Sequence, residues 1–419
     1  METRLTASFR ASQQAAVAEP ILRACVHCGF CNATCPTYQL LGDELDGPRG
    51  RIYQIKQVLE GQPATRTVQQ HLDRCLTCRN CETTCPSGVH YGHLVEIGRE
   101  VVEQQVRRPW SERMLHALLR GVLTRRDLFG TLLKVGRVLR PLLPRSLRDK
   151  VTPARAEGRW PRNAATSARQ VLLLRGCVQP SMLPSIDAAT ARVLDAIGIG
   201  VLTAGSAGCC GAIRHHLNDP RGALENMRAN IDAWWPYLES GGIDTIVVNA
   251  SGCTAMAKEY GHLLRDDPAY ASKARRISDC TRDITEFLLP HAETLRSRLV
   301  AGSTAKVAVQ TPCTLQHAQQ LSSVMERLLE QLGVASTAVA EPHLCCGSAG
   351  SYSLLHPQLS RQLRDRKLEN LQRGDPCMIL SDNIGCIAHL AGGTTLPVWH
   401  WIEWLDQAIG AASGAAPSM

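Results

Sequence analysis

The chain has 419 residues, a net charge of +8 and 18 cysteines. This length predicts two or three domains, each with its own core. The charge allows contact with an acidic partner or an anionic membrane but gives no reason to expect nucleic-acid binding. No apolar run is long enough for a transmembrane helix. Residues 1–20, a polar lead-in, lack the apolar stretch of a signal peptide, so we expect a cytoplasmic protein whose cysteines are metal ligands rather than disulfides.

Residues 21–106 contain two cysteine runs of identical spacing, Cys-x2-Cys-x2-Cys-x3-Cys-Pro. This is the bacterial ferredoxin spacing for [4Fe–4S] clusters, in which the fourth cysteine of each run ligates the other cluster. Structural zinc fits less well, because zinc sites use two separated Cys-x2-Cys knuckles or cysteines combined with histidines. The runs therefore predict two [4Fe–4S] clusters. One is expected on Cys25, Cys28, Cys31 and Cys85, and the other on Cys75, Cys78, Cys81 and Cys35.

The segment between the two runs is long and has a helical pattern. Its apolar residues Ile52, Ile55, Val58 and Leu59 recur at helical intervals. We therefore expect a helical variant of the two-cluster ferredoxin domain rather than a minimal one.

Residues 107–168 form a basic, amphipathic region followed by a linker. Between residues 107 and 150 the apolar residues fall at helical spacing, and basic residues far outnumber acidic ones. Two interpretations remain open: a surface that lies on anionic lipid or docks a partner subunit, and a solvated basic face of helices packed on their own protein. Residues 151–168, rich in Pro, Gly, Ala and Ser, are typical of an interdomain linker.

From residue 169 onward, strands alternate with helices in two repeats, which we assign to domains at 169–285 and 286–419. The register of the repeats is close, because 32 positions separate Cys177 from Cys209 and also Cys313 from Cys345. Alternating strands and helices predict parallel βαβ units, with the cysteines on loops after the strands. The fold class expected is thus a mixed α+β and α/β multidomain protein: a helical ferredoxin-like domain and two repeated α/β domains.

Each repeat brings four cysteines from separate loops, which suits a metal or cluster site. The glycine after each Cys-Cys pair would let both thiols turn toward one centre. A further iron–sulfur cluster, zinc and a metal-free reactive dithiol all remain open. The candidate ligands are Cys177, Cys209, Cys210 and Cys253 in the first repeat, and Cys313, Cys345, Cys346 and Cys386 in the second.

Other chemistry-bearing residues carry weaker signals. Cys280 and Cys377 fall outside the repeat and are expected to be ordinary semi-buried thiols. The histidines near the cysteine pairs are interpreted as structural or hydrogen-bonding residues, and a proton-handling role near a quinone is the alternative. They are His215, His216, His317 and His389. No phosphate-binding loop, dinucleotide fingerprint or nucleophile elbow stands out, so a flavin or nicotinamide site is not expected on this chain.

A ferredoxin pair followed by two Cys…Cys-Cys-Gly…Cys repeats resembles the iron–sulfur subunits that contain two cysteine-rich CCG domains. These include subunits of heterodisulfide reductase, anaerobic glycerol-3-phosphate dehydrogenase and lactate utilisation. The resemblance is closest to the glycolate oxidase (glycolate dehydrogenase) iron–sulfur subunits. It is carried by residues 21–61, 71–89, 230–236, 251–261 and 312–352.

The resemblance implies an electron-transfer subunit with no catalytic residues of its own, in an oxidoreductase complex acting on the CH–OH group of 2-hydroxy acids. FAD-containing partner subunits would oxidise glycolate to glyoxylate. The acceptor, other than oxygen, would be a membrane quinone, with the complex on the cytoplasmic face of the inner membrane. The alternatives are the same role for lactate or glycerol-3-phosphate, or thiol–disulfide chemistry as in heterodisulfide reductase.

One departure from the heterodisulfide reductase pattern is visible. In those relatives each repeat ends in Cys-x2-Cys, whereas here Met256 and His389 stand at the last position. A five-cysteine cluster and disulfide reduction are therefore not carried over to this chain.

Overall fold

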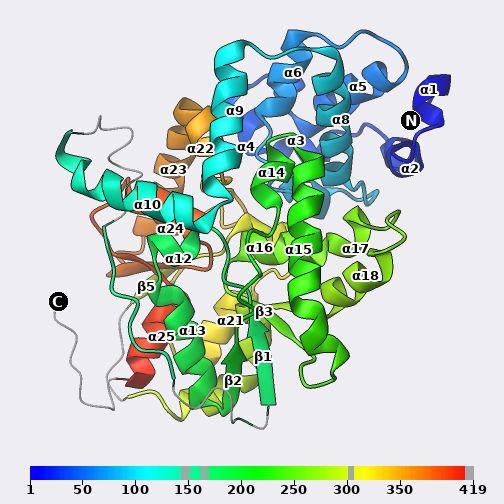
Figure 1. The fold of residues 1–419 in the computed structure, drawn as a ribbon. Helices are drawn as coiled ribbons and strands as arrows, with labels where there is room; N and C mark the ends of the chain where they lie inside the picture. Colours follow the sequence, from blue (N-terminus) through cyan, green and yellow to red (C-terminus); the bar gives the residue numbers. More distant parts are fainter. Residues whose placement is uncertain (143–150, 152, 162–166, 168, 301–305, 411–419) are drawn as a thin grey trace.

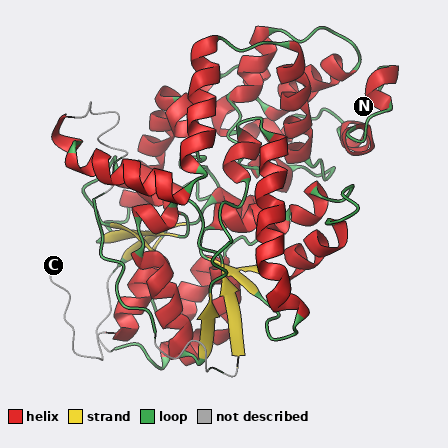
Figure 2. Cartoon of the chain, in the orientation of Figure 1, coloured by secondary structure: helices red, strands yellow, loops and turns green. Residues whose placement is uncertain are grey.

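A computed structural model describes residues 1–419 except 143–150, 152, 162–166, 168, 301–305 and 411–419. Figure 1 shows the N-terminal helices, in blue, at one end of the molecule and the strands of the first sheet toward the other. Helices dominate, and the strands form two small sheets (Figure 2). The predicted fold class, a helical ferredoxin-like domain followed by two α/β repeats, is confirmed.

The N-terminal module is built entirely from helices and the cysteine loops between them. The long helices α5 and α8 pack through Ile55 and Leu94, both fully buried. Thr65 begins α6 as an N-cap, because its hydroxyl accepts a hydrogen bond from the backbone N–H of Val68. The elements are α1 (Ala7–Arg10), α2 (Ala15–Ala24), α3 (Phe30–Ala33), α4 (Pro36–Leu41), the 3₁₀ helix η1 (Glu44–Asp46), α5 (Pro48–Leu59), α6 (Arg66–Asp73), α7 (Asn80–Thr84) and α8 (Tyr91–Gln105).

The basic region forms surface helices. They are α9 (Trp110–Leu123), α10 (Arg126–Val138) and the 3₁₀ helix η2 (Arg140–Leu142). Leu119 and Leu133 turn inward and are buried. Part of the linker predicted at residues 151–168 lies outside the described residues.

The first repeat contains a four-stranded, fully parallel sheet in the order β2-β1-β3-β4. Asp219 caps α15 and Pro220 occupies its first turn, where a missing N–H costs nothing. The strands are β1 (Arg169–Leu173), β2 (Ile199–Leu202), β3 (Ile246–Val248) and β4 (Thr281–Asp283). The helices are α12 (Gln179–Met182), α13 (Ser185–Ala196), α14 (Ala212–His216), α15 (Pro220–Glu239), α16 (Ser251–Lys258), α17 (Tyr260–Leu263) and α18 (Ala271–Cys280).

The second repeat copies this topology with the order β6-β5-β7-β8, again parallel throughout. Its strands are β5 (Val307–Gln310), β6 (Ser336–Thr337), β7 (Met378–Ser381) and β8 (Val398–His400). The helical elements from residue 284 onward are α19 (Ile284–Leu288), the 3₁₀ helix η3 (Leu289–His291), α20 (Ala292–Arg296), the π-helical turn η4 (Thr314–Ala318), α21 (Val324–Gln331), α22 (Tyr352–Leu355), α23 (Pro357–Gln372), α24 (Ile384–Ala391) and α25 (Trp401–Gly410).

The two repeats share one hydrophobic core. Side chains of β1 and α13 from the first repeat and of β5 and α25 from the second belong to a single buried cluster. A separate cluster lies between the first sheet and α15–α18, and another fills the N-terminal module. The two repeats therefore pack against each other through a common core and are not separate domains joined by a linker. Since every strand is parallel, the segments that follow the strands leave from one edge of each sheet. The prediction that all the repeat cysteines lie on loops was wrong for Cys253 and Cys386, which lie in the first turns of α16 and α24.

Candidate metal centres

The two ferredoxin runs share one backbone conformation. In the first run His27 and Gly29 have left-handed φ angles of 60° and 90°. In the second run Thr77 and Arg79, at the equivalent positions, have φ angles of 53° and 57°. Non-glycine residues rarely adopt this conformation, and such strain gathers at functional sites. Here it curls each loop so that successive cysteines face a common hollow.

The first hollow, of about 420 Å³, lies at the surface of the N-terminal module. It is lined by Cys25, Cys28 and Cys31 of the first run together with Cys81 and Cys85 of the second. Cys28 is exposed, whereas Cys25 is buried. Burial raises the pKa of Cys31 to about 11. Burial therefore disfavours a free, charged thiolate at Cys31.

The second hollow, of about 310 Å³, has no fully exposed cysteine in its lining. It is lined by Cys75, Cys78 and Cys81 of the second run and Cys35 of the first. It adjoins the first hollow, since Cys81 and Tyr91 line both. The geometry therefore brings the fourth cysteine of each run to the other run's first three.

Two buried arginines set the charge around the second hollow. Arg51 is 1% exposed, and Arg99 donates from Nη2 to the carbonyl of Cys75 at 2.7 Å. Burial alone would raise the pKa of Cys75, but the guanidinium groups of Arg51 and Arg99 hold it below its ordinary value. The Tyr91 hydroxyl also donates to Cys75 Sγ, at 3.6 Å. This environment favours an anionic occupant, as a thiolate-ligated cluster is.

The four cysteines of the second repeat gather at the carboxyl edge of its sheet. Sγ of Cys313 lies 3.8 Å from Sγ of Cys345, and the thiols of Cys346 and Cys386 interact with each other. Gly347, after the pair, has a φ of +85°, the left-handed turn expected there. A buried cation faces this set: Lys367 is 2% exposed, and burial lowers its pKa while the four cysteines oppose that change.

The first repeat gathers its four cysteines in the same way. Cys177 interacts with Cys209, Cys209 with Cys210, and Cys210 with Cys253. Gly211 has a φ of +95°. Two hydrogen bonds fix the backbone of the Cys209–Cys210 pair. Tyr260 Oη donates to the Cys210 carbonyl, and Asn230 Nδ2 donates to the Cys209 carbonyl.

Neither set in the repeats is compact enough for a single preformed ion. Tetrahedral zinc holds thiolates at about 2.3 Å from the metal, which keeps the sulfurs about 4 Å apart. Among the described residues, the one group of three or more ligand atoms that all lie within 4.8 Å of one another is Asp43, Asp46 and His71. Close pairs such as Cys313 and Cys345, 3.8 Å apart, have the zinc spacing, but no third sulfur of either set completes it.

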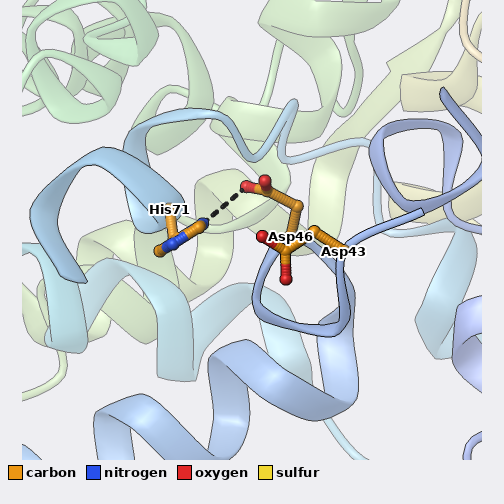
Figure 3. A group of neighbouring side chains, drawn as sticks. All are labelled: Asp43, Asp46 and His71. Carbon is orange, nitrogen blue, oxygen red and sulfur yellow. Dashed lines mark ion pairs between the residues drawn. The ribbon is translucent and has the colours of Figure 1, made fainter. Parts of the chain in front are cut away.

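That carboxylate–histidine group is an ion-pair network rather than a metal centre. Figure 3 shows His71 directed at Asp46, with Nδ1 3.0 Å from Oδ1. Asp46 also pairs with Arg51 at 3.4 Å and Arg74 at 2.9 Å, so its charge is already compensated. The network packs Arg51 behind Cys35 and Cys75.

The second ferredoxin hollow and the second repeat's cysteines are neighbours. The charges of Cys313 and Cys345 each interact with that of Cys78. A small apolar cluster that includes Leu76, Cys345 and Tyr352 joins the two sites. Asn80 and Thr83 complete the contact by hydrogen bonds to the His343 carbonyl and to His317 Nδ1. The first repeat meets the N-terminal module elsewhere, through the ion pair of His215 with Glu96 at 2.9 Å.

The remaining predicted residues fall outside these centres. Cys280 is buried and Cys377 is exposed, so the expectation of semi-buried thiols was wrong for both. His389 is buried against Ser360, and Met256 packs in the core. Sequence patterns gave no signal for Arg51, Arg99 or Lys367, because each lies in a helix with ordinary polar spacing and approaches its cysteines only through packing.

These features define the chain as an iron–sulfur protein with a dicluster module and two cysteine-rich α/β domains. Family models agree: residues 21–89 match the 4Fe-4S dicluster domain, and residues 171–258 and 307–391 match the cysteine-rich domain.

Similarity to individual proteins identifies the family more closely. The chain is 54% identical over 409 residues to the glycolate oxidase iron-sulfur subunit of Escherichia coli (strain K12), covering 98% of this chain and 99% of that protein. It is 29% identical to the probable glycolate oxidase iron-sulfur subunit of Bacillus subtilis (strain 168), covering 88% of each chain. Lactate utilization protein A of Geobacillus thermodenitrificans is 27% identical, over 57% of this chain and 99% of that protein. The chain belongs to the family of glycolate oxidase iron–sulfur subunits.

Proposed function

We propose that this chain is the electron-transfer subunit of a glycolate-oxidising complex, passing electrons from flavin-containing partner subunits toward a membrane quinone. Oxidation of glycolate to glyoxylate on the partners releases two electrons and two protons. Iron–sulfur clusters, when bound, take up and release electrons one at a time. The observation that carries the proposal is the pair of adjoining cysteine-lined hollows, combined with the 54% identity to the Escherichia coli subunit.

The ligand sets proposed are Cys25, Cys28, Cys31 and Cys85 for one [4Fe–4S] cluster, and Cys75, Cys78, Cys81 and Cys35 for the other. The lining of the two hollows supports this exchange of fourth ligands. Arg51 and Arg99 favour an anionic group in the second hollow.

The first hollow is bordered by exposed residues and the second by the second repeat, and this difference suggests a direction for electron transfer between them. Beside exposed Cys28, Val26 is 66% and Phe30 63% exposed. The second hollow instead faces the cysteines of the second repeat through Cys78. We therefore assign the first site to the contact with the flavin-containing partner and the second to the interior of the path.

We extend the proposal to a further cluster on Cys313, Cys345, Cys346 and Cys386. Buried Lys367 and the neighbouring Cys78 favour it over zinc. Iron and sulfide analysis of the anaerobically purified chain tests it: about twelve irons or more support a further cluster, and about eight contradict it. Cys313→Ser should lower the iron content, with Cys280→Ser as the matched control outside the sites.

The test of the electron-transfer role uses Cys78→Ser in the assembled complex, with exposed Cys377→Ser as control. Glycolate should still bleach the partner's flavin in the Cys78 variant, while reduction of a quinone analogue is lost. The control should retain both. A flavin that is no longer reduced in the Cys78 variant, or quinone reduction that persists, contradicts the proposal.

A second candidate is the same role in lactate oxidation, which the similarity to lactate utilization protein A favours. Comparing bleaching of the partner's flavin by lactate with bleaching by glycolate separates the two. Disulfide reduction is disfavoured, because Met256 and His389 are buried where the heterodisulfide reductase pattern has a last thiol.

A further inference from the structure

Helices α9 and α10 present an unusual concentration of exposed apolar side chains. Most of the large apolar residues that the structure describes as exposed lie between Trp110 and Leu142. Figure 1 shows both helices on the side of the molecule that faces the reader. Soluble surfaces scatter such residues singly, so a concentration of this kind marks a contact surface.

The exposed residues of α10 form a regular stripe. Leu128, Leu132 and Val135, continued by Leu139 directly after the helix, follow one another at helical spacing, and all four are 39–49% exposed. On the opposite side of the helix, Leu133 is buried in the core shared by the two repeats. The stripe is therefore the outer face of a helix that is already anchored, and not a core face left unpacked.

The outer face of α9 carries a second stripe. Trp110, Met114 and Leu118, at intervals of four residues, are 75%, 60% and 60% exposed. Leu119 and His116 on the inner side are buried. A tryptophan at the end of such a stripe is typical of side chains that sit at the boundary between lipid and water.

The basic residues of this region divide into two groups by what they contact. The inner ones are used to fix the helices: Arg126 donates to the Gly176 carbonyl at 3.2 Å, and Arg120 donates to the carbonyl of Leu217. The outer ones are exposed, and within the described part of the chain no carboxylate forms an ion pair with them. These outer residues are Arg107, Arg113, Arg125, Lys134 and Arg140.

From this arrangement we infer that α9 and α10 form a docking surface for an anionic lipid bilayer, on which the chain lies without crossing the membrane. The apolar stripes would enter the region between head groups and acyl chains while the outer basic residues meet lipid phosphates. None of the helices in the described part of the chain is long and apolar enough to span a bilayer, so the contact is peripheral.

Charge distinguishes lipid from a second copy of this chain. Residues 107–142 contain only Glu112 and Asp127 as acidic residues, and Glu112 already contacts Arg66 and Arg108. Two such surfaces face to face would repel each other. An anionic bilayer instead provides negatively charged head groups for the basic residues and an acyl-chain region for the apolar stripes. This inference goes beyond the electron-transfer role and does not depend on it.

The test is co-sedimentation of the purified full chain with vesicles of equal parts phosphatidylglycerol and phosphatidylcholine, compared with phosphatidylcholine alone. We expect binding to the anionic vesicles that weakens with added salt. Leu132→Glu should reduce it at least tenfold, whereas Tyr237→Glu, an equal charge change at an exposed aromatic residue of α15, should leave it unchanged. Because each basic residue near an anionic surface strengthens binding by roughly fivefold, the combined Arg113→Gln, Lys134→Gln and Arg140→Gln variant should lose about a hundredfold.

Two results would overturn the inference. One is equal binding of the wild-type chain to anionic and neutral vesicles, or no binding to either. The other is a Leu132→Glu variant that binds vesicles normally but no longer assembles with the flavin-containing subunits, which would make this face a subunit interface. All variants are at exposed positions, and circular dichroism verifies that they fold.

Discussion

The ion pair between His215 and Glu96 joins the first cysteine-rich repeat to the N-terminal module, and its removal is expected to be costly. His215 Nε2 lies 2.9 Å from Glu96 Oε2, and the two side chains are 12% and 15% exposed. Burial would raise the pKa of Glu96, but the imidazolium of His215 holds it well below its usual range. Burial would lower the pKa of His215, yet Glu96 raises it above the ordinary value. Both partners are therefore charged.

The size of the effect follows from the contact distance. Two unit charges 2.9 Å apart attract by about 6 kcal/mol at an effective dielectric constant of about 20. Loss of hydration offsets most of this in the intact pair, but removing His215 leaves the Glu96 carboxylate buried without its hydrogen-bonded partner, with Arg79 as a nearby cation. We expect His215→Gln to lower the free energy of unfolding by about 3–5 kcal/mol. The double variant with Glu96→Gln should lose clearly less than the single variant, because the buried carboxylate is removed together with its imidazolium partner, while nearby Arg79 keeps its ion pair with Glu259.

The measurement is anaerobic urea unfolding followed by tryptophan fluorescence and circular dichroism. His291→Gln, a half-buried histidine on another helix, is the matched control. Since the chain has several domains, midpoints and slopes are compared for each transition rather than assumed to be one. A single-variant loss below about 1 kcal/mol, typical of exposed pairs, would refute the reasoning, as would a double variant no better than the single one.

The pH dependence of this pair has a defined sign. The contribution of His215 is fully present below its unfolded pKa of about 6.5 and is lost as pH rises through its raised folded pKa. The contribution of Glu96 is present above about pH 4.3 and is lost as pH falls through its lowered pKa. The difference between wild type and His215→Gln should therefore be largest between about pH 4.5 and 6.5.

Three further predictions concern buried positions. A Cβ at Gly347 would lie 2.5 Å from the Ser360 carbonyl oxygen, whereas a Cβ at the equivalent Gly211 would lie 3.1 Å from its nearest neighbouring atom. Gly347→Ala should therefore lower Tm more than Gly211→Ala does. Equal Tm values for the two variants would contradict this. Burial raises the pKa of Asp382 to about 7. The folded chain therefore keeps a proton that the unfolded chain releases near pH 4, and the free energy of unfolding falls as pH rises from about 4 to about 7. Asp382→Asn should be more stable than wild type at pH 8 in thermal melts, and a less stable variant would count against the argument. Arg99→Gln removes a positive charge beside Cys75 and should lower the midpoint potential of one of two EPR signals in a redox titration; unchanged potentials would show that Arg99 does not act on the cluster.

Much of the fold was predictable because its signals are local. The strands β1, β2, β3, β5 and β7 consist of short apolar runs and helix α13 has helical spacing, so these elements can be recognised from the sequence. The strands β4, β6 and β8 cannot be recognised in this way. They are two or three residues long and include polar side chains such as Asp283 and Ser336, so no periodic pattern forms. Their strand conformation depends on pairing with neighbours distant in sequence.

The sequence by itself determined which residues carry the chemistry, because each ferredoxin run places three thiols within seven residues on one loop and each repeat attaches its cysteines to strand ends. Only the tertiary structure decided how these groups are related to one another. It placed Cys78 beside Cys313 and Cys345, buried Arg51 and Arg99 behind the second hollow, and turned the apolar stripes of α9 and α10 outward. The physical reason is that these relations join residues tens to hundreds of positions apart. Their proximity is set by packing of whole helices and sheets, for which spacing along the chain gives no signal.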